Sequence, residues 1–332
     1  MAILQDSANA ISTKVTVASK LKPFFKFCDD VSLNRLPPSG HQMVCYAAYL
    51  VATGTCTTEG SLRQYLSVVK TMCAKQNLFC PSPSEYTPLG ETVRGMHRLF
   101  AGPVRRSKPI TPMILTNLLN SNPPPNPSWL QQIILQTMKD ASLLLFFTML
   151  RSSNLMAPYP SAVNRDRLLT WSKIDRVDNG LVLTMIHEKT IQFRERLHCI
   201  PLASRPGSRF CPVAAIERLA AARGVLNLAP DDPVLMLPSG SDFSWQPMCK
   251  YQYNSWFKSR ITQMKLDPAR YFIHGYRHGG VSLALLVEEN ITLVRLTSNH
   301  LSAAIMTYSQ ISPDKRFRVS SRMVDALESE SQ

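Results

Sequence analysis

Apolar residues recur at three- and four-residue steps through much of the chain, which is the spacing of amphipathic helices. The clearest example is Val15, Ala18, Leu21, Phe25 and Cys28. The segment that ends at Gly54 is apolar on most sides and is predicted to be a largely buried helix. We predict N-terminal helices over residues 12–30, 41–54, 61–77 and 90–100.

The pattern changes in the second half of the chain. Residues 129–155 are predicted to form one long helix, and residues 143–150 are apolar on all of its sides. After this helix the spacing of apolar residues shortens from the helical period to that of strands. Asp178-Asn179-Gly180 is a strong hairpin signal. We predict three short antiparallel strands here, followed by helices over 211–225 and 251–265. The fold class is therefore mainly α with a small antiparallel β-sheet.

The length of 332 residues exceeds what a single core usually reaches, so two domains are expected. Residues 101–109 combine a glycine, two prolines and a basic cluster, which makes them the best candidate for a linker. We expect a helical domain over residues 1–108, with this basic linker at its end. A domain that combines helices with the small sheet is expected over residues 109–332.

The charge of the chain favours a polyanionic partner. Its net charge is +14, and both parts contribute: residues 1–108 carry 13 Lys+Arg against 6 Asp+Glu, and the remainder carries 24 against 17. We expect double-stranded DNA as the partner of both parts. For each candidate phosphate contact the alternative is an ordinary solvated charge. These candidates are Arg63 and Lys70 on a helix, Arg105, Arg106 and Lys108 in the linker, and Arg194 on the hairpin.

Other partners and compartments receive less support. No apolar run approaches the ~20 residues that span a bilayer, so no membrane segment is expected. The N-terminus lacks the basic flank and apolar core of a secretory signal. The eight cysteines are scattered without a CxxC pair, which suits free thiols in a reducing compartment and argues against a zinc site.

Candidate chemistry is concentrated near the C-terminus, in residues 271–311. His274, Arg277 and His278 fall within five residues, and His300 and Tyr308 follow an apolar segment. An arginine between histidines can attract a phosphate, and a tyrosine can attack one. Each of these residues taken alone is more often structural.

Two residues from earlier in the chain complete a set. Arg151 ends a buried helix, where a charge is costly unless it has an anionic partner. Lys189 lies in the predicted turn between the second and third strands, and Lys173, early in the first strand, is a less favoured alternative. His198 on a strand and Tyr276 inside the C-terminal motif have structural interpretations.

The order Arg151, Lys189, His274-x-x-Arg277, His300, Tyr308 resembles the signature of the tyrosine recombinase (integrase) family. The resemblance covers nearly the whole chain and implies a helical core-binding domain followed by an α+β catalytic domain. The local sequences around residues 61–70, 108–112 and 150–155 look most like recombinases of eukaryotic mobile elements (crypton- or DIRS-like).

This chain departs from the family pattern at two places. The interval from His300 to Tyr308 is one residue shorter than is common, which leaves Asn299 as an alternative to His300 for the His/Trp position. Asn154 stands three residues after Arg151, where many relatives carry an acid. That acid supports the site, so the change concerns fine positioning rather than the chemistry.

The resemblance assigns a role to each member of the set. Two guanidiniums neutralise the nonbridging oxygens of a phosphodiester, a base helps the tyrosine to ionise, and an acid protonates the leaving 5′-oxygen. The product is a 3′-phosphotyrosyl intermediate, which requires neither metal nor ATP. The roles fall to Arg151 and Arg277 on the phosphate, His274 as base, Lys189 as acid, His300 on the phosphate, and Tyr308 as nucleophile.

The expected function is site-specific DNA recombination for the integration or excision of a mobile element. By resemblance, four protomers assemble on two DNA sites and exchange a C-terminal helix, for which the segment containing Phe317, Val319, Met323 and Leu327 is the candidate; a frayed terminus is the alternative. The expected compartment is the nucleus, with a bacterial or phage-infected cytoplasm, at the nucleoid, as the alternative. Rival functions are a type IB topoisomerase and a domesticated DNA-binding protein without activity.

Overall fold

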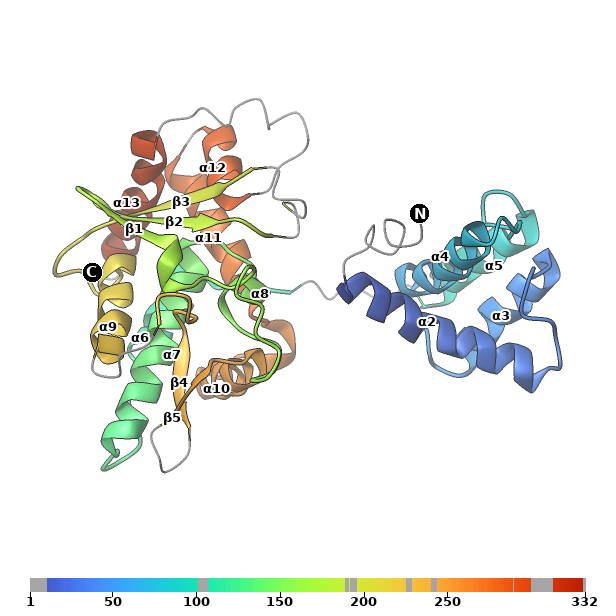
Figure 1. Cartoon of the computed structure of the whole chain (residues 1–332), viewed down its shortest axis with the longest axis horizontal. Coiled ribbons are helices and arrows are strands. Elements are labelled where there is room, and N and C mark those ends of the chain that lie inside the picture. Colours follow the sequence, from blue (N-terminus) through green and yellow to red (C-terminus); the bar gives the residue numbers. More distant parts are fainter. Residues whose placement is uncertain are drawn as a thin grey trace. The chain divides into compact units, whose positions relative to one another are not determined.

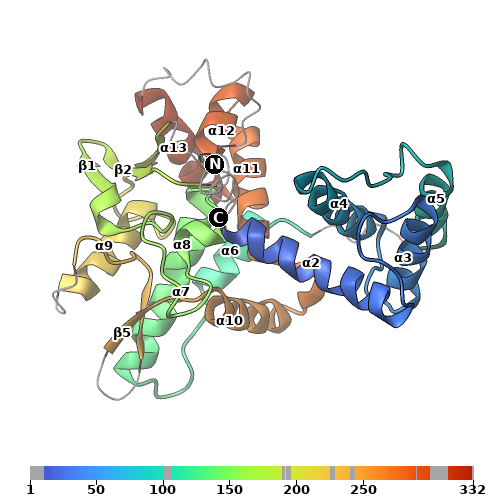
Figure 2. The same cartoon turned by 45° about the vertical axis from the view of Figure 1, so that its right-hand side comes forward.

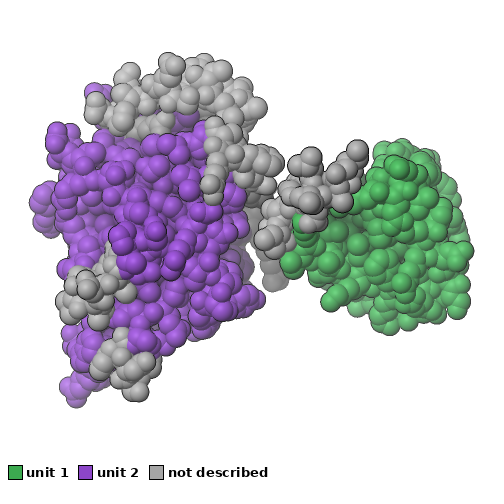
Figure 3. All heavy atoms as spheres, viewed as in Figure 1, with its two compact units in different colours: residues 1–105 green, residues 106–332 purple. Residues whose placement is uncertain are grey.

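The computed structural model describes residues 11–100, 107–188, 191, 196–224, 229–239, 244–288, 290–299 and 313–330. The chain divides into two compact units, residues 1–105 and 106–332, which Figure 3 colours separately. Residues 101–106 lie outside the described part. Lys108 already belongs to unit 2, because its backbone N–H donates to the Arg270 carbonyl at 2.9 Å. The linker expected at 101–109 otherwise stays a prediction.

Helices make up the described part of unit 1. Ser39 and Thr58 cap two of them, since each side chain accepts a hydrogen bond from a backbone N–H in the first turn. Their apolar faces meet in one core, in which Phe24, Tyr46 and Leu62 are fully buried. The helices are α2 (Ile11–Asp30), α3 (Gly40–Ala52), α4 (Glu59–Lys75) and α5 (Thr87–Phe100), as labelled in Figure 1.

Unit 2 combines helices with antiparallel strands. Its helices of eight or more residues are α6 (Pro112–Leu119), α7 (Trp129–Phe147), α9 (Pro212–Gly224), α10 (Lys250–Gln263), α11 (His274–Val287), α12 (Ile291–Ser298) and α13 (Pro313–Ser329). The shorter ones are α8 (Ser152–Leu155) and the 3₁₀ turns η1 (Trp171–Lys173) and η2 (Pro268–Arg270). Figures 1 and 2 show α12 and α13 at one end of the unit and β5 (Ser244–Pro247) with α10 at the other.

The predicted sheet is present, with strand order β1-β2-β3 and antiparallel pairing throughout. Its strands are β1 (Ile174–Val177), β2 (Gly180–Met185) and β3 (His198–Ala203). Val177 pairs with Gly180 across the predicted turn. Gly180 has φ +151°, and a Cβ there would lie 2.0 Å from the Leu202 carbonyl oxygen, so only glycine fits. The expectation of a mainly helical fold with a small antiparallel sheet is confirmed.

One predicted helix is wrong in extent. The helix expected over 129–155 ends at Phe147, and the chain turns before α8 begins at Ser152. Met149 has φ +51°, which a continuous helix does not allow. The turn is held from outside, because Arg277 donates to the Met149 carbonyl at 2.6 Å. Arg151 is consequently the N-cap of α8 rather than the end of a long helix.

A second hairpin is absent from the sequence-based prediction. Strand β4 (Met236–Ser239) pairs with β5, and each has only four residues. Pro238 and Pro247 lie inside these strands, and proline is a poor strand residue. The pattern therefore gives no strand signal here.

The C-terminal helix α13 packs against β3 and α11 of its own chain. Val319, Met323 and Leu327, which were expected to dock on a partner or to fray, are fully buried in the unit 2 core. Ser320 also accepts a hydrogen bond from the Ala203 backbone at 3.1 Å. None of the described helices has the length and apolarity to cross a bilayer.

Glycines in α11 allow this helix to pack closely against the rest of unit 2. A Cβ at Gly279 would lie 1.9 Å from the Ile110 carbonyl oxygen, and one at Gly280 would lie 2.2 Å from the Phe146 carbonyl oxygen. Both contacts are with backbone, which cannot move aside as a flexible side chain can. The glycines of the HGYRHGG motif therefore set the distance between α11 and α7.

We expect Gly279→Ala to lower the free energy of unfolding of unit 2 by about 1–3 kcal/mol, because the new methyl overpacks the interface. All four tryptophans lie in unit 2, so their fluorescence during urea unfolding reports on this unit alone. Gly95→Ala in α5, where a Cβ would meet nothing within 4 Å, is the matched control; because unit 1 holds no tryptophan, both variants are also followed by far-ultraviolet circular dichroism. A tryptophan transition that is unchanged in Gly279→Ala would contradict the close packing.

Candidate active site

Arg151 stands at the turn between α7 and α8. Its side chain is about one-quarter exposed, and Nη1 lies 3.7 Å from Oε2 of the buried Glu188. That distance makes an ion pair but not a hydrogen bond. Nη1 is itself buried and has no hydrogen-bond partner among the described residues. The Glu188 carboxylate therefore lies beside the buried edge of the guanidinium, while part of the Arg151 side chain remains exposed.

Arg277 lies in the first turns of α11 and is 2% exposed. Its Nη1 donates to the Met149 carbonyl and its Nη2 to the Ser298 carbonyl, each at 2.6 Å. Burial lowers the pKa of Arg277 to about 10, and Arg151 adds to this, while Glu188 opposes it. The guanidinium thus remains charged near neutral pH and joins the α7–α8 turn to the end of α12.

His274 begins α11 and is exposed. Its ring centroid lies 4.7 Å from that of His278. Although the side chain is largely exposed, partial desolvation of the ring lowers the pKa of His274 below 6.5, and nearby His278, Arg277, Arg151 and Lys250 lower it further. The imidazole is therefore neutral near pH 7, which is the form that can accept a proton.

The structure thus brings together three of the six predicted catalytic residues: Arg151, His274 and Arg277. Lys189, His300 and Tyr308 lie outside the described residues. The described neighbours of two of them are close to the arginines, since Glu188 pairs with Arg151 and Ser298 accepts from Arg277. The predicted sequence order is therefore compatible with one site. The structure describes three of its six residues, and the roles of all six stay predictions.

Asn299, the alternative to His300, is fully buried at the C-cap of α12. Its φ of +52° is left-handed, which asparagine tolerates better than most residues. Arg196 donates to its Oδ1 at 2.5 Å. Asn299 is therefore engaged in shaping the end of α12, and the choice between Asn299 and His300 stays a prediction.

Two buried residues beside the arginines were not predicted as part of the site. Glu188 and His198 are buried beside the arginines, and Nδ1 of His198 lies 2.5 Å from Oε1 of Glu188. Burial tends to raise the pKa of Glu188, but the hydrogen bond and charge of His198 lower it overall, with help from Asn299 and Arg277. The only sequence signal for Glu188 is its position next to Lys189.

Tyr276 has the structural role expected for it. It is fully buried, and its hydroxyl forms a closed set of hydrogen bonds with those of Tyr253 and Ser142, at 2.6 to 3.2 Å. These three residues lie on α11, α10 and α7. The set fixes α11, and with it His274 and Arg277, against the core.

Lys173, the alternative catalytic lysine, is occupied elsewhere. Its Nζ donates to the carbonyls of Arg165, Asp166 and Leu168 at 2.6, 2.9 and 2.6 Å. Burial lowers its pKa below the ordinary value. The side chain holds the loop that precedes β1.

We expect Lys173→Met to lower the free energy of unfolding of unit 2 by about 1–3 kcal/mol, because carbonyl groups lose their donor. The rate constant of DNA cleavage by the folded molecules should stay unchanged. Tryptophan-detected urea unfolding and single-turnover cleavage separate the two effects. A large loss of rate at unchanged stability would instead move the catalytic lysine role to Lys173.

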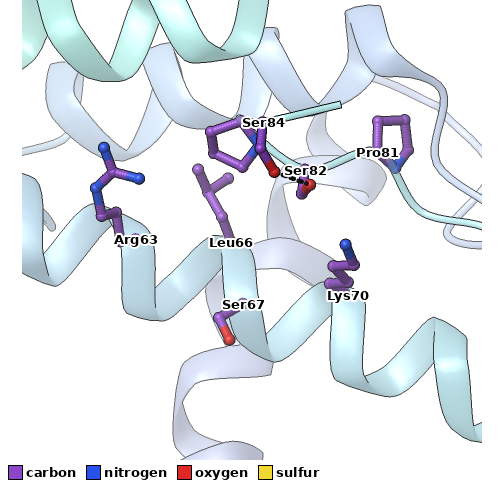
Figure 4. Close-up of a pocket in the computed structure, with 8 residues that line it drawn as sticks. Arg63, Leu66, Ser67, Lys70, Pro81, Ser82 and Ser84 are labelled. Atoms are coloured by element: carbon purple, nitrogen blue, oxygen red, sulfur yellow. Dashed lines mark hydrogen bonds between the residues drawn. The ribbon is translucent and has the colours of Figure 1, made fainter. Parts of the chain in front are cut away.

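The predicted DNA contacts fall into two groups. Arg63 and Lys70 are exposed on α4 and line a hollow with Leu66, Ser67 and the 81–84 segment (Figure 4). Each is ion-paired, Arg63 with Glu59 and Lys70 with Glu85. Lys108 is exposed in unit 2, whereas Arg105, Arg106 and Arg194 lie outside the described residues. None of these roles is tested by the structure.

The described residues hold no group of three or more His, Cys, Asp or Glu side chains arranged for a metal ion. Each of the eight cysteines is a free thiol.

Comparisons with known proteins identify the fold. No protein-family model matches the sequence, and no curated protein matches it. Among solved structures, XerH recombinase bound to palindromic difH in a post-cleavage complex has a TM-score of 0.57 at 13% identity, over 95% of this chain and 78% of that one. The Tn1549 transposon integrase in complex with transposon right end DNA has a TM-score of 0.55 at 13% identity, over 99% and 97%.

A lambda integrase dimer bound to a COC′ core site has a TM-score of 0.53 at 14% identity, over 92% of this chain and 90% of that one. At these identities the comparisons establish the fold, and the fold is that of the tyrosine recombinases and phage integrases.

Proposed function

We propose that this protein is a site-specific DNA recombinase that cleaves and rejoins DNA strands through a tyrosyl intermediate. The observation that carries the proposal is the meeting of Arg151, His274 and Arg277 from distant segments in one site. Their fold is shared with recombinases that are bound to DNA in their own solved structures. The net charge of +14 is consistent with a DNA partner.

The two arginines bind the scissile phosphate. Arg277 is held rigidly by two backbone carbonyls, and Arg151, about one-quarter exposed, lies beside the buried Glu188. Fixed donors of this kind stabilise the charge that develops on the nonbridging oxygens as the phosphorus is attacked. His300, the expected third donor, bonds to the same phosphate.

The remaining residues move protons. Neutral His274 accepts the phenolic proton of Tyr308 as its oxygen attacks the phosphorus. The bond from phosphorus to the 5′-oxygen breaks, and Lys189 protonates that oxygen. The 3′-phosphotyrosyl bond retains the free energy of the phosphodiester, so the 5′-hydroxyl of another strand can reverse the step. No external energy source is needed.

Assembly and biological role extend the proposal. Exchange between two DNA sites requires protomers on both, which favours a tetramer. The proposed natural substrate is a mobile element that is integrated or excised. The protein is proposed to be related to the recombinases of the eukaryotic crypton- or DIRS-like group and to act in the nucleus.

The test uses a library of nicked duplexes with randomised sequence, in which the short fragment carrying the 5′-hydroxyl diffuses away after cleavage. SDS-resistant complexes are isolated, their DNA is sequenced, and the protein is digested with trypsin. We expect the DNA on the peptide of residues 296–315, in which Tyr308 is the sole tyrosine. An adduct on another peptide would overturn the assignment.

The same material separates the rival functions. Joining of two DNAs that carry the selected site supports recombination, whereas relaxation of supercoiled plasmid without any joining supports a type IB topoisomerase. Selective binding in native gels with no SDS-resistant complex would indicate a DNA-binding protein without strand-transfer activity.

A further inference from the structure

Glu188 is a fully buried carboxylate that makes no contact with bulk water. One oxygen, Oε1, accepts from Nδ1 of His198, and the other, Oε2, faces Nη1 of Arg151 at 3.7 Å. Its charge also acts on Arg277. A buried carboxylate is costly unless such partners surround it, and here they are the cations of the site.

His198 extends this contact to the end of α12. Its Nε2 lies 3.0 Å from the Thr297 carbonyl, which can only accept a hydrogen bond. The ring therefore donates from Nε2 to Thr297 and from Nδ1 to the ionised Glu188. A single side chain on β3 thus joins the residue before Lys189 to the last turn of α12, three residues before His300.

The backbone around Glu188 is also fixed. Glu188 and Ile191 exchange two backbone hydrogen bonds at 3.3 and 3.1 Å, and Ile191 is fully buried. On the other side, the Asn154 amide donates to the His187 carbonyl at 3.2 Å and to the Arg167 carbonyl at 3.0 Å. Asn154 therefore holds the backbone segment that carries Glu188.

We propose that Glu188 and His198 act as one positioning pair, which holds Arg151 and the end of α12 in place around the scissile phosphate. Asn154, three places after Arg151, is neutral, and Glu188 supplies the buried negative charge beside Arg151. The inference rests on the proposed recombinase function, since it names what aligns that site. Neither residue touches the reacting atoms.

Two physical arguments support a positioning role over a purely structural one. First, burial and the neighbouring charge of Arg151 both lower the pKa of Arg277, and Glu188 is the buried anion that opposes this. Secondly, packing of the core does not require a charge at this position. A protein in which apolar residues replace a buried ion pair is often as stable as the original. The pair is therefore best explained by the orientation it imposes on Arg151.

The decisive variant is Glu188→Gln, which keeps the shape and an acceptor for His198 but removes the charge. Cleavage of the selected nicked duplex is measured in single turnover with excess protein. We expect the rate constant to fall on the order of tenfold to a hundredfold, because small displacements of a charge-neutralising group are costly. The affinity for DNA, measured in native gels, should stay within about threefold of wild type. Removal of the Glu188 charge strengthens rather than weakens the attraction between the site and a phosphate.

Further readouts distinguish positioning from stability. Partial unfolding would lower the amplitude of cleavage but not the rate constant of the folded molecules. The ratio of rates on the two phosphorothioate diastereomers at the scissile position should also change, because Arg151 no longer faces one nonbridging oxygen in a fixed way. A structural role would leave that ratio unchanged.

A double-mutant cycle tests whether the two residues act as a unit. In His198→Gln both donors sit on one nitrogen, so the side chain cannot span Glu188 and Thr297 as the two ring nitrogens do, and the rate should fall as in Glu188→Gln. The double variant should be no slower than the slower single variant, as expected for coupled residues. Glu217→Gln and His187→Gln are matched controls that should keep the wild-type rate constant.

The outcomes are separable. If the wild-type protein forms no SDS-resistant adduct, the proposed function fails before any variant is compared. If the wild type reacts and Glu188→Gln keeps its rate constant within about twofold, only the positioning pair is refuted. Multiplicative losses in the double variant would refute the coupling between Glu188 and His198.

Discussion

Replacing Arg277 with lysine will reduce DNA cleavage by about 10³-fold, the scale on which fixed oxyanion donors act. The guanidinium spans two carbonyls, those of Met149 and Ser298, at 2.6 Å each. A lysine ammonium is a compact charge that lacks this planar fork, so it cannot hold both carbonyls in one plane and face a phosphate as well. The α7–α8 turn and the end of α12 then lose their shared anchor.

The measurement is the single-turnover rate constant on the selected nicked duplex, with tryptophan-detected unfolding recorded alongside. Arg176→Lys is the matched control, since Arg176 is exposed on β1 and pairs only with Glu217 among its described contacts. A substrate with an uncharged methylphosphonate at the scissile position should recover part of the loss. A rate within tenfold of wild type on the ordinary substrate would show that Arg277 does not neutralise the phosphate.

The sequence predicts most of the fold because local patterns determine it. The helical periods of the N-terminal part and the Asp178-Asn179-Gly180 turn each depend on neighbouring residues only, and the structure contains both. The break after Phe147 does not follow from local pattern. Residues 143–150 are strongly apolar, and the left-handed Met149 is stabilised by Arg277, which is 128 positions away.

The residues of the site likewise divide into those that the sequence predicts and those that it does not. Arg151, His274 and Arg277 are predictable because their residue types and order match one chemistry. Glu188 and His198 are not, since a charged residue at a strand end ordinarily indicates a solvated position. Their burial depends on Arg151 and Thr297, which come from other elements. Only tertiary structure shows that the carboxylate faces the cations of the site.

The positive surroundings of His274 predict an unusual pH profile. Burial and the neighbouring His278, Arg277, Arg151 and Lys250 lower its pKa below 6.5. A base must be unprotonated to act, so the cleavage rate should be constant from pH 8 down to the ordinary histidine value and should fall only below it. The acid limb of the profile therefore lies below pH 6.5.

His274→Gln removes the base while it keeps a polar side chain at the start of α11. We expect cleavage to fall on the order of 10²–10³-fold, within the usual range for loss of a general base, and the acid limb to disappear. His278→Gln should act differently: the rate at pH 7.5 should be nearly unchanged, but the acid limb should shift upward, because one cause of the lowered pKa of His274 is gone. An acid limb that persists in His274→Gln would assign the base to another group. Rates should be taken at constant ionic strength, since the attraction of DNA to a basic protein itself varies with salt.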